Sequence, residues 1–193
     1  MIRIATETDV PAILAIYAPY VRDTTITFEY DVPTEAEFLD RFREITERFP
    51  WLVWVENGEI LGYAYACLPF GRAAYRWCAE PSIYLKPSAR GQGIGRRLYL
   101  ALEEILKELG YQVLLALVTG ENAASVRFHE KLGYEVAGEL KATGYKMGHW
   151  CSVFWMEKQV NFVDNPMEFP MSWNQIGGNI QKIDDILYKL SLS

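Results

Sequence analysis

The sequence predicts an α/β fold in which helices flank a mixed, mostly antiparallel sheet. Helix-like and strand-like hydrophobic patterns alternate along the 193 residues. An Asn57-Gly58 pair joins the apolar runs 51–55 and 60–68, which is the strongest short signal for an antiparallel hairpin. A glycine-rich loop, residues 90–97, leads from a strand-like run into a strongly periodic helix. Half of the residues are hydrophobic, enough to build one full core.

The chain opens with a short strand and a long helix. Residues 1–5 form the predicted strand. Thr8 or Asp9 is a suitable cap for the helix that follows, and Pro11 fits its first turn. The apolar residues of this helix recur at helical spacing, namely Val10, Ile13, Leu14, Tyr17 and Val21.

A second helix is predicted to start at Thr34, because Glu37 three residues later completes a capping box. Its apolar stripe consists of Phe38, Phe42 and Ile45. Pro50 follows its end, and the hairpin begins directly afterwards. Residues 78–85 predict another strand, which leads into the glycine-rich loop.

The second half of the chain continues the alternation. The helix after the glycine-rich loop has the stripe Leu98, Leu102, Ile105, Leu106 and Leu109, and Gly110 ends it. Residues 113–118 are apolar on both faces, which predicts a central strand. A short helix at 123–131 and strands at 135–140 and 151–157 complete the order β-α-α-β-β-β-α-β-α-β-β.

We expect one domain over residues 1–160 and a C-terminal extension over residues 161–193. A loop with proline and aromatic residues spans 159–178. An amphipathic helix follows, with the apolar residues Ile180, Ile183, Ile186, Leu187 and Leu190. We expect this helix to pack against its own domain, and a contact with a second subunit is the alternative.

The composition excludes several classes of protein. A net charge of −6 and a pI near 5.1 argue against nucleic-acid binding. The three widely spaced cysteines, Cys67, Cys78 and Cys151, fit neither a disulfide framework nor a metal site. No apolar run has the length of a membrane span, and the N-terminus lacks the apolar core of a signal peptide. We expect a soluble, cytoplasmic protein without a metal.

The glycine-rich loop reads Arg90-Gly91-Gln92-Gly93-Ile94-Gly95-Arg96-Arg97. Its glycines allow successive main-chain N–H groups to converge on an anion at a helix N-terminus, and the arginines add positive charge. The spacing matches neither a dinucleotide fingerprint nor a Walker loop, so an ATP-binding protein is poorly supported. The loop predicts a pyrophosphate cradle, with an ordinary strand-to-helix turn as the alternative.

The loop resembles the acetyl-coenzyme A signature Arg/Gln-x-x-Gly-x-Gly/Ala of the GCN5-related N-acetyltransferases (GNAT). Residues 122–134 resemble a second segment of that family, which lines the pantetheine and nucleotide side. The resemblance implies the GNAT fold and acetyl-CoA as co-substrate. It implies these cofactor-binding residues: Ile83, Tyr84, Leu85, Arg90, Gly91, Gln92, Gly93, Ile94, Gly95, Arg96, Asn122, Ser125 and Lys131. Asn122 also suits an ordinary helix cap.

A closer resemblance covers the first 160 residues or so. It is to the phosphinothricin and methionine sulfoximine/sulfone N-acetyltransferases, and it rests on residues 27–31, 49–53, 62–66, 79–84, 125–134 and 144–150. It implies acetylation of the α-amine of a small amino-acid analogue by direct transfer. It also implies that Glu80 is the general base and that His129 belongs to the active site.

The chemistry explains why such residues are needed. The amine of a free amino acid is mostly protonated at neutral pH, so a carboxylate must remove a proton before the nitrogen attacks. A main-chain N–H in 83–85 can stabilise the negative charge that forms on the carbonyl oxygen. His129 stands where the wider family often has a tyrosine that acts as the acid for the thiolate. The alternatives are a structural role for His129 and a carboxylate facing water for Glu80.

The acceptor pocket is placed by family position alone. Its candidates are Phe28, Glu29, Arg72, Tyr75, Tyr145, Lys146 and His149. An arginine or lysine can hold a carboxylate or phosphinate oxygen, and an ordinary surface charge is the alternative for Arg72 and Lys146.

Two other functions stay open on the sequence. One is a GNAT enzyme for another amine: a polyamine, an aminoglycoside or a protein N-terminus. The other is an acyl-CoA-binding module without turnover, which would need neither Glu80 nor His129. The resemblance further implies a homodimer.

Overall fold

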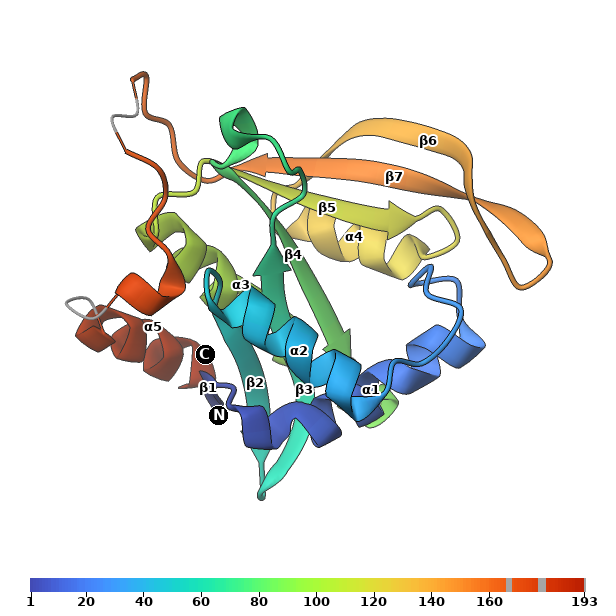
Figure 1. Cartoon of the computed structure of the whole chain (residues 1–193), viewed down its shortest axis with the longest axis horizontal. Helices are drawn as coiled ribbons and strands as arrows, with labels where there is room; N and C mark the ends of the chain where they lie inside the picture. The colour runs from blue at the N-terminus through green and yellow to red at the C-terminus, as the bar shows by residue number, and fades with distance from the viewer. Residues whose placement is uncertain (166–167, 177–179, 193) are drawn as a thin grey trace.

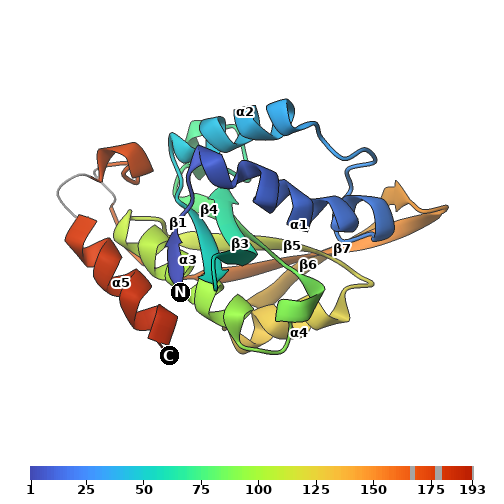
Figure 2. The ribbon, with the colours of Figure 1, turned by 90° about the horizontal axis from the view of Figure 1, so that it is seen from below.

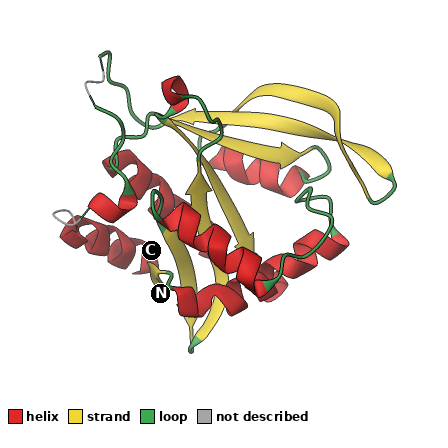
Figure 3. Ribbon diagram, in the orientation of Figure 1, coloured by secondary structure: helices red, strands yellow, loops and turns green. Residues whose placement is uncertain are grey.

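The computed structural model describes residues 1–165, 168–176 and 180–192. Seven strands form one mixed sheet, in the order β1-β2-β3-β4-β5-β7-β6 (Figures 1 and 3). The strands are β1 (Ile2–Ile4), β2 (Trp51–Glu56), β3 (Glu59–Cys67), β4 (Cys78–Leu85), β5 (Val113–Thr119), β6 (Glu135–Lys146) and β7 (His149–Gln159). The helices are α1 (Val10–Asp23), α2 (Glu35–Thr46), α3 (Ile94–Glu108), α4 (Ala123–Lys131) and α5 (Ile180–Leu192). The predicted α/β class and element order are confirmed.

The helices form a layer on each face of the sheet. Figure 2 shows α1 and α2 on one face, and α3, α4 and α5 on the other. One core cluster joins α1 and α2 to β2 and β3, and a second joins α3 and α5 to the strands from the opposite side. The strands β2 and β3 are therefore covered by helices on both faces of the sheet.

Local signals set the helix starts. Thr34 caps α2: its Oγ1 accepts from the Glu37 N–H at 3.3 Å, while the Glu37 carboxylate accepts from the Thr34 N–H at 2.8 Å. Asp9 precedes α1 as expected, but its carboxylate accepts from Arg3 and from the Thr6 N–H instead of capping α1. Pro11 lies in the first turn of α1, as predicted.

The C-terminal helix α5 packs against its own domain, as expected. It contacts α3 and β1, and Ile183 and Leu187 are buried there. The Ile2 N–H donates to Ser191 Oγ at 2.7 Å, which joins the two ends of the chain. The predicted end of the preceding loop, at Gly178, lies outside the described residues.

The β6–β7 hairpin is longer than the sequence indicated. Strands were predicted at 135–140 and 151–157, whereas β6 continues to Lys146 and β7 begins at His149. Met147 and Gly148 both have positive φ in the tight turn between them. Nearly all of β6 is exposed, so no hydrophobic alternation marked its second half.

The strands β4 and β5 start side by side and then diverge. Their parallel pairing is limited to Cys78 with Val113 and Ala79 with Leu114, and Figure 1 shows the two strands separating beyond that point. Pro81 follows, and proline has no N–H to donate to a ladder. The separation opens the middle of the sheet, and the candidate site lies there.

Candidate active site

A cavity of about 290 Å³ fills the gap between β4 and β5. The end of α1 and the loop after it border the gap from one face of the sheet, and the start of α3 and α4 border it from the other. Eight of the residues predicted for the site line this cavity: Ile83, Tyr84, Leu85, Arg90, Gly95, Asn122, Ser125 and His129. The cavity thus brings together residues that were predicted from separate parts of the sequence to bind acetyl-CoA or to act on it.

The edge of β4 that faces the cavity is open to a ligand. Both main-chain groups of Leu85 point into the gap, because the Tyr20 hydroxyl donates to the Leu85 carbonyl at 2.5 Å and accepts from its N–H at 3.3 Å. Main-chain directions alternate along an antiparallel strand, so the N–H of Ile83, two residues earlier, points the same way. Ile83 therefore presents a donor where a neighbouring strand would otherwise lie.

Tyr20 was missed by the sequence analysis. It comes from α1 and reaches the end of β4, and its hydroxyl also accepts from Arg90 Nη2 at 2.9 Å. The tyrosine had been assigned to no role, because nothing in the pattern of α1 separates a core tyrosine from a tyrosine that reaches across the fold. The contact fixes the Arg90 guanidinium beside the cavity.

The glycine-rich loop forms the start of α3. Gly91 and Gly93 both have φ near +77°, a conformation that residues with a Cβ rarely adopt. Gly93 is the N-cap of α3 and has no side chain to bind the first N–H groups of the helix. These N–H groups therefore remain available to an anion, where the helix dipole also favours negative charge.

The other residues of the loop have distinct positions. Gln92 Nε2 donates to the Ser88 carbonyl at 2.7 Å, and Arg96 is exposed. Ile94 is 1 % exposed, so only its main chain can face a ligand. A Cβ added to Gly95 would lie 3.1 Å from Leu85 Cδ1, which shows how closely α3 approaches β4.

The start of α4 closes the far side of the cavity. Asn122 caps the helix, since its side chain accepts from the Ser125 N–H at 3.2 Å. Thr119, at the end of β5, also lines the cavity, and its buried Oγ1 has no hydrogen-bond partner among the described residues. Such an unpaired hydroxyl is suited to a ligand. Thr119 was not among the residues predicted for the site. The predicted residue Lys131 is exposed at the end of α4 and does not line the cavity.

His129 is buried and held at both ring nitrogens. Its Nδ1 lies 2.8 Å from the Ser125 carbonyl oxygen, which can only accept, so Nδ1 carries the hydrogen. Its Nε2 lies 3.0 Å from the Tyr99 hydroxyl. Burial lowers the pKa of His129, which keeps the ring neutral at neutral pH.

Glu80 lies on β4 beside the cavity, next to Pro81 and Ser82 of its lining. Its side chain is half-buried, and burial raises the pKa of its carboxyl group. It is paired across the ladder with Cys67, whose own pKa is raised to about 12 by burial. Cys67 is thus a poor nucleophile at neutral pH.

The predicted acceptor residues fall into separate groups. Phe28 packs on β6 at Gly144, where an added Cβ would lie 2.2 Å from the ring. Tyr30 donates from its hydroxyl to the carbonyl of the exposed Tyr145 on β6. Glu29 is paired with Arg41 at 2.8 Å instead of facing the cavity lining.

Lys146 and the pair Arg72 and Tyr75 lie apart from that group. Lys146 is 4 % exposed, and its Nζ donates to the carbonyls of Val21 and Thr27 at 2.7 Å each. The lysine therefore ties β6 to the end of α1. Arg72 and Tyr75 are exposed around a short 3₁₀ turn, where Tyr75 packs on Phe70 with ring centroids 4.6 Å apart.

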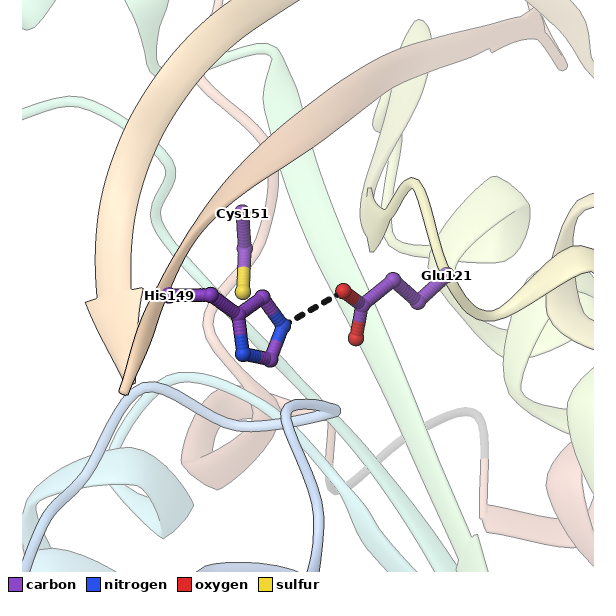
Figure 4. A group of neighbouring side chains, drawn as sticks. All are labelled: Glu121, His149 and Cys151. Atoms are coloured by element: carbon purple, nitrogen blue, oxygen red, sulfur yellow. Dashed lines mark hydrogen bonds and ion pairs between the residues drawn. The ribbon is translucent and has the colours of Figure 1, made fainter. Parts of the chain in front are cut away.

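His149 forms an ion pair that the sequence did not reveal. Its Nε2 lies 2.6 Å from Glu121 Oε1 (Figure 4). Thr25 Oγ1 donates to the other Glu121 oxygen at 2.8 Å. Hydrogen bonding to Glu121 raises the pKa of His149, so its positive form is favoured. Glu121 lies between two residues of the cavity lining, Thr119 and Asn122.

Cys151 lies next to this pair. Potential ligand atoms of Glu121, His149 and Cys151 lie within 4.8 Å of one another, so this group could hold a metal ion. The ion pair and the hydrogen bond from Thr25 already account for the positions of Glu121 and His149. The Cys151 thiol is protonated at neutral pH, because burial raises its pKa.

No helix within the described residues combines the length and the apolar character needed to span a membrane.

Comparison with known proteins agrees with the fold. The family model described as "Acetyltransferase (GNAT) domain" matches residues 2–155. The crystal structure of a GNAT superfamily phosphinothricin acetyltransferase from Sinorhizobium meliloti in complex with AcCoA superposes with a TM-score of 0.81. The two chains are 36 % identical, and the match covers 89 % of this chain and 92 % of the other. The chain is an acetyl-CoA-dependent N-acetyltransferase with the fold of that class.

The relatives in sequence narrow the class. The phosphinothricin N-acetyltransferase of Alcaligenes faecalis is 38 % identical over 168 residues, or 86 % of this chain and 85 % of the relative. The L-methionine sulfoximine/L-methionine sulfone acetyltransferase of Pseudomonas aeruginosa is 35 % identical over 161 residues, or 81 % and 92 % of the two chains. The chain belongs to the GNAT family, in the branch of the phosphinothricin and methionine sulfoximine/sulfone N-acetyltransferases.

Proposed function

We propose that the protein acetylates the α-amine of a small amino-acid analogue such as phosphinothricin, methionine sulfoximine or methionine sulfone, with Glu80 as general base. One observation carries the proposal. The open edge of β4 at Ile83 leads from the N-terminus of α3 toward Glu80, and the cavity lining ends at Pro81, directly beside Glu80 in the strand. The names of the relatives supply the class of acceptor.

The residues of the cavity fit acetyl-CoA. The free N–H groups at the start of α3 suit its pyrophosphate, with Arg90 beside them. The unpaired Thr119 Oγ1 suits an amide of its pantetheine arm, and the Ile83 N–H suits the carbonyl oxygen of its thioester. When bound, acetyl-CoA supplies the thioester that the amine attacks.

Glu80 is suited to remove the proton from the amine. Its raised pKa brings a carboxylate closer to neutral pH, which strengthens it as a base while it remains ionised. The Ile83 N–H then stabilises the charge that develops on the carbonyl oxygen. His129 is suited to return a proton to the leaving sulfur, and its neutral ring with a hydrogen on Nδ1 has one to give.

The acceptor is expected at the end of the cavity bounded by α1 and the β6–β7 hairpin. The positive form of His149 is suited to hold its carboxylate, and Phe28 and Tyr145 supply apolar surface. Lys146 supports this site indirectly. Its ammonium group donates to two main-chain carbonyls and so fixes the position of β6. The role in acceptor binding that was predicted for Arg72, Tyr75 and Glu29 would require their loops to move toward the cavity.

The experiment is a thiol-release assay with acetyl-CoA and a panel of amines. We expect release with methionine sulfone and phosphinothricin, and none above background with a polyamine or an aminoglycoside. Acetyl-CoA binding without release for any acceptor would favour a binding module instead. Release with the polyamine alone would assign the enzyme to another acceptor class.

We further propose a cytoplasmic homodimer. The three cysteines are free thiols, which fits a reducing compartment, and the exposed β6–β7 hairpin offers surface for a second copy. Sedimentation velocity at micromolar concentration is expected to give a dimer, and a monomer alone would contradict this assembly.

A further inference from the structure

A string of polar side chains that are buried in the core leads from the cavity toward Lys158, which is partly exposed. It begins at His129 and continues through Tyr99 on α3 and Tyr134 after α4 to Glu103, also on α3. All four side chains lie in the core, with exposures of 4 %, 0 %, 2 % and 4 %. At the far end Glu103 Oε2 binds Lys158 Nζ at 2.6 Å, and the Lys158 side chain is 23 % exposed.

The middle of the string contains two unpaired polar atoms. The Tyr134 hydroxyl and Glu103 Oε1 are buried, and neither has a hydrogen-bond partner in the described parts of the chain. Buried polar atoms are rarely left without a partner. Both lie close to the rest of the string: the ring centroids of Tyr99 and Tyr134 are 6.0 Å apart, and Lys158 Nζ, which binds Glu103, lies 5.6 Å from the ring centroid of Tyr134. A small shift of these side chains, or one water molecule, would join them.

The hydrogen positions follow from the partners. Because His129 Nδ1 must donate to the Ser125 carbonyl, Nε2 accepts the hydrogen of Tyr99. Tyr99 then has only a lone pair to offer, so Tyr134 donates to it. The Tyr134 oxygen in turn accepts from Glu103, provided that Glu103 is protonated, and burial raises its pKa despite Lys158.

Ser125 connects the string to the cavity. Its Oγ lies 3.3 Å from His129 Nδ1, and both residues belong to the cavity lining. His129 therefore has one nitrogen on the side of the cavity and the other on the side of Tyr99. Glu80 is a further charge near the string, because it contributes to raising the pKa of Tyr99 after burial and Glu103.

We propose that Tyr99, Tyr134 and Glu103 form a proton relay that resupplies His129 from the interior while His129, acting through the Ser125 hydroxyl, protonates the leaving sulfur. This inference rests on the role of His129 in the proposed function. The His129 Nδ1 hydrogen passes to Ser125 Oγ as the Ser125 hydroxyl gives its own to the sulfur. Nε2 takes the hydrogen of Tyr99, Tyr99 that of Tyr134, and Tyr134 that of the Glu103 carboxyl group.

The transfer is balanced. One proton is gained by the sulfur and one is lost by Glu103, which ends as a carboxylate paired with the Lys158 ammonium group. Every group between them breaks one bond to hydrogen and forms one. The resting state returns when the same shifts run in reverse: a proton from water in the cavity enters at Ser125 Oγ, Ser125 gives its own to His129 Nδ1, and each group passes one on until Glu103 is protonated again. The Ser125 carbonyl favours this form because it accepts from Nδ1–H.

Tyr134→Phe tests the relay without touching His129 or the cavity lining. We expect kcat to fall by about tenfold with KM for both substrates unchanged. We also expect the solvent deuterium effect on kcat to change from a multi-proton to a single-proton dependence. Glu103→Gln keeps the size of the side chain and a hydrogen bond to Lys158, but its amide cannot release a proton. We expect it to show the same fall in kcat and the same change in isotope dependence as Tyr134→Phe.

Tyr111→Phe is the matched control. Tyr111 is also fully buried, and its hydroxyl is bound at 3.1 Å by Arg48 Nε, away from the string. Equal kcat and equal isotope dependence in Tyr134→Phe and Tyr111→Phe would overturn the relay. His129→Gln separates the two hypotheses, since normal turnover in that variant would contradict the proposed role of His129 itself.

Nitrogen NMR of the histidine rings gives a readout apart from activity. The chain has two histidines, so His149→Gln leaves a single signal set, from His129. We expect a neutral ring with hydrogen on Nδ1, and a shift of the Nε2 resonance when Tyr99→Phe removes its donor. A ring with hydrogen on Nε2 would overturn the relay, because Tyr99 could not then donate to it.

Discussion

Glu80 shows how surroundings adapt a single residue to its chemistry. Burial raises the pKa of its carboxyl group. In the wild type, kcat/KM is expected to fall as the pH drops through this raised pKa, because protonation removes the base. Glu80→Gln is expected to lower kcat by about 100-fold or more and to remove this acidic limb, while affinity for acetyl-CoA is unchanged.

Steady-state kinetics across the pH range, with acetyl-CoA binding measured separately, provide the check. Glu56→Gln is the control, since Glu56 is an exposed carboxylate at the end of β2. Turnover that is unchanged at every pH in Glu80→Gln would remove Glu80 from the mechanism.

Lys146 gives a second test on a single residue. Lys146→Met keeps much of the apolar stem but leaves the Val21 and Thr27 carbonyls without their donor. We expect the free energy of unfolding to fall by about 2 kcal/mol or more, measured by urea denaturation. Lys141→Met, at an exposed position on the same strand, is expected to cost little. Equal stability of the two variants would contradict the structural role.

Among the elements, the start of α3 has a paired test in the chain. Gly93→Ala and Gly58→Ala both place a Cβ on a backbone with φ near +78°, at +77° and +79° respectively. Each is expected to cost about 1 kcal/mol of stability. Gly93→Ala should also raise KM for acetyl-CoA, because the strain falls on the anion site, whereas Gly58→Ala in the β2–β3 turn should not. An equal KM in both variants would show that the loop binds no pyrophosphate.

The elements that the sequence predicted well are those with local signals. The capping box of α2 and the Asn57-Gly58 turn act within a few residues, so their positions could be read directly. The second half of β6 carries no such signal, because it is an exposed edge strand held by pairing with β7. Its extent depends on a partner that no window of sequence contains.

Across the whole molecule, α5 is expected to contribute to the stability of the core cluster that it shares with α3. Leu187→Ala should lower the free energy of unfolding by about 2–4 kcal/mol, since Leu187 is 6 % exposed. Tyr188→Ala, one residue further and 71 % exposed, should have little effect. Urea unfolding of both variants provides the measurement. A low cost for Leu187→Ala would mean that α5 is docked only loosely.

The site could be predicted only where its residues lie close together in the sequence. Residues 83–95 and 122–129 belong to two motifs, and eight of the predicted positions meet in one cavity. Tyr20, Thr119 and Glu121 carry no motif and reach the site through the path of the whole chain. Lys146 was a candidate by family position, yet its partners come from the end of α1 and the loop after it, which only the folded chain reveals.

Because β4 diverges from β5, the binding of acetyl-CoA can be followed by hydrogen exchange at a main-chain amide of β4. Without acetyl-CoA, the Ile83 amide faces the gap and should exchange its hydrogen with solvent quickly, whereas its neighbours Ser82 and Tyr84, which pair with β3, should exchange slowly. Bound acetyl-CoA should slow exchange at Ile83 in particular, because its thioester oxygen would accept from this amide. Beyond Ala79, β4 has no neighbouring strand on this side within the described parts of the chain. Bound acetyl-CoA would occupy the position that such a strand would take.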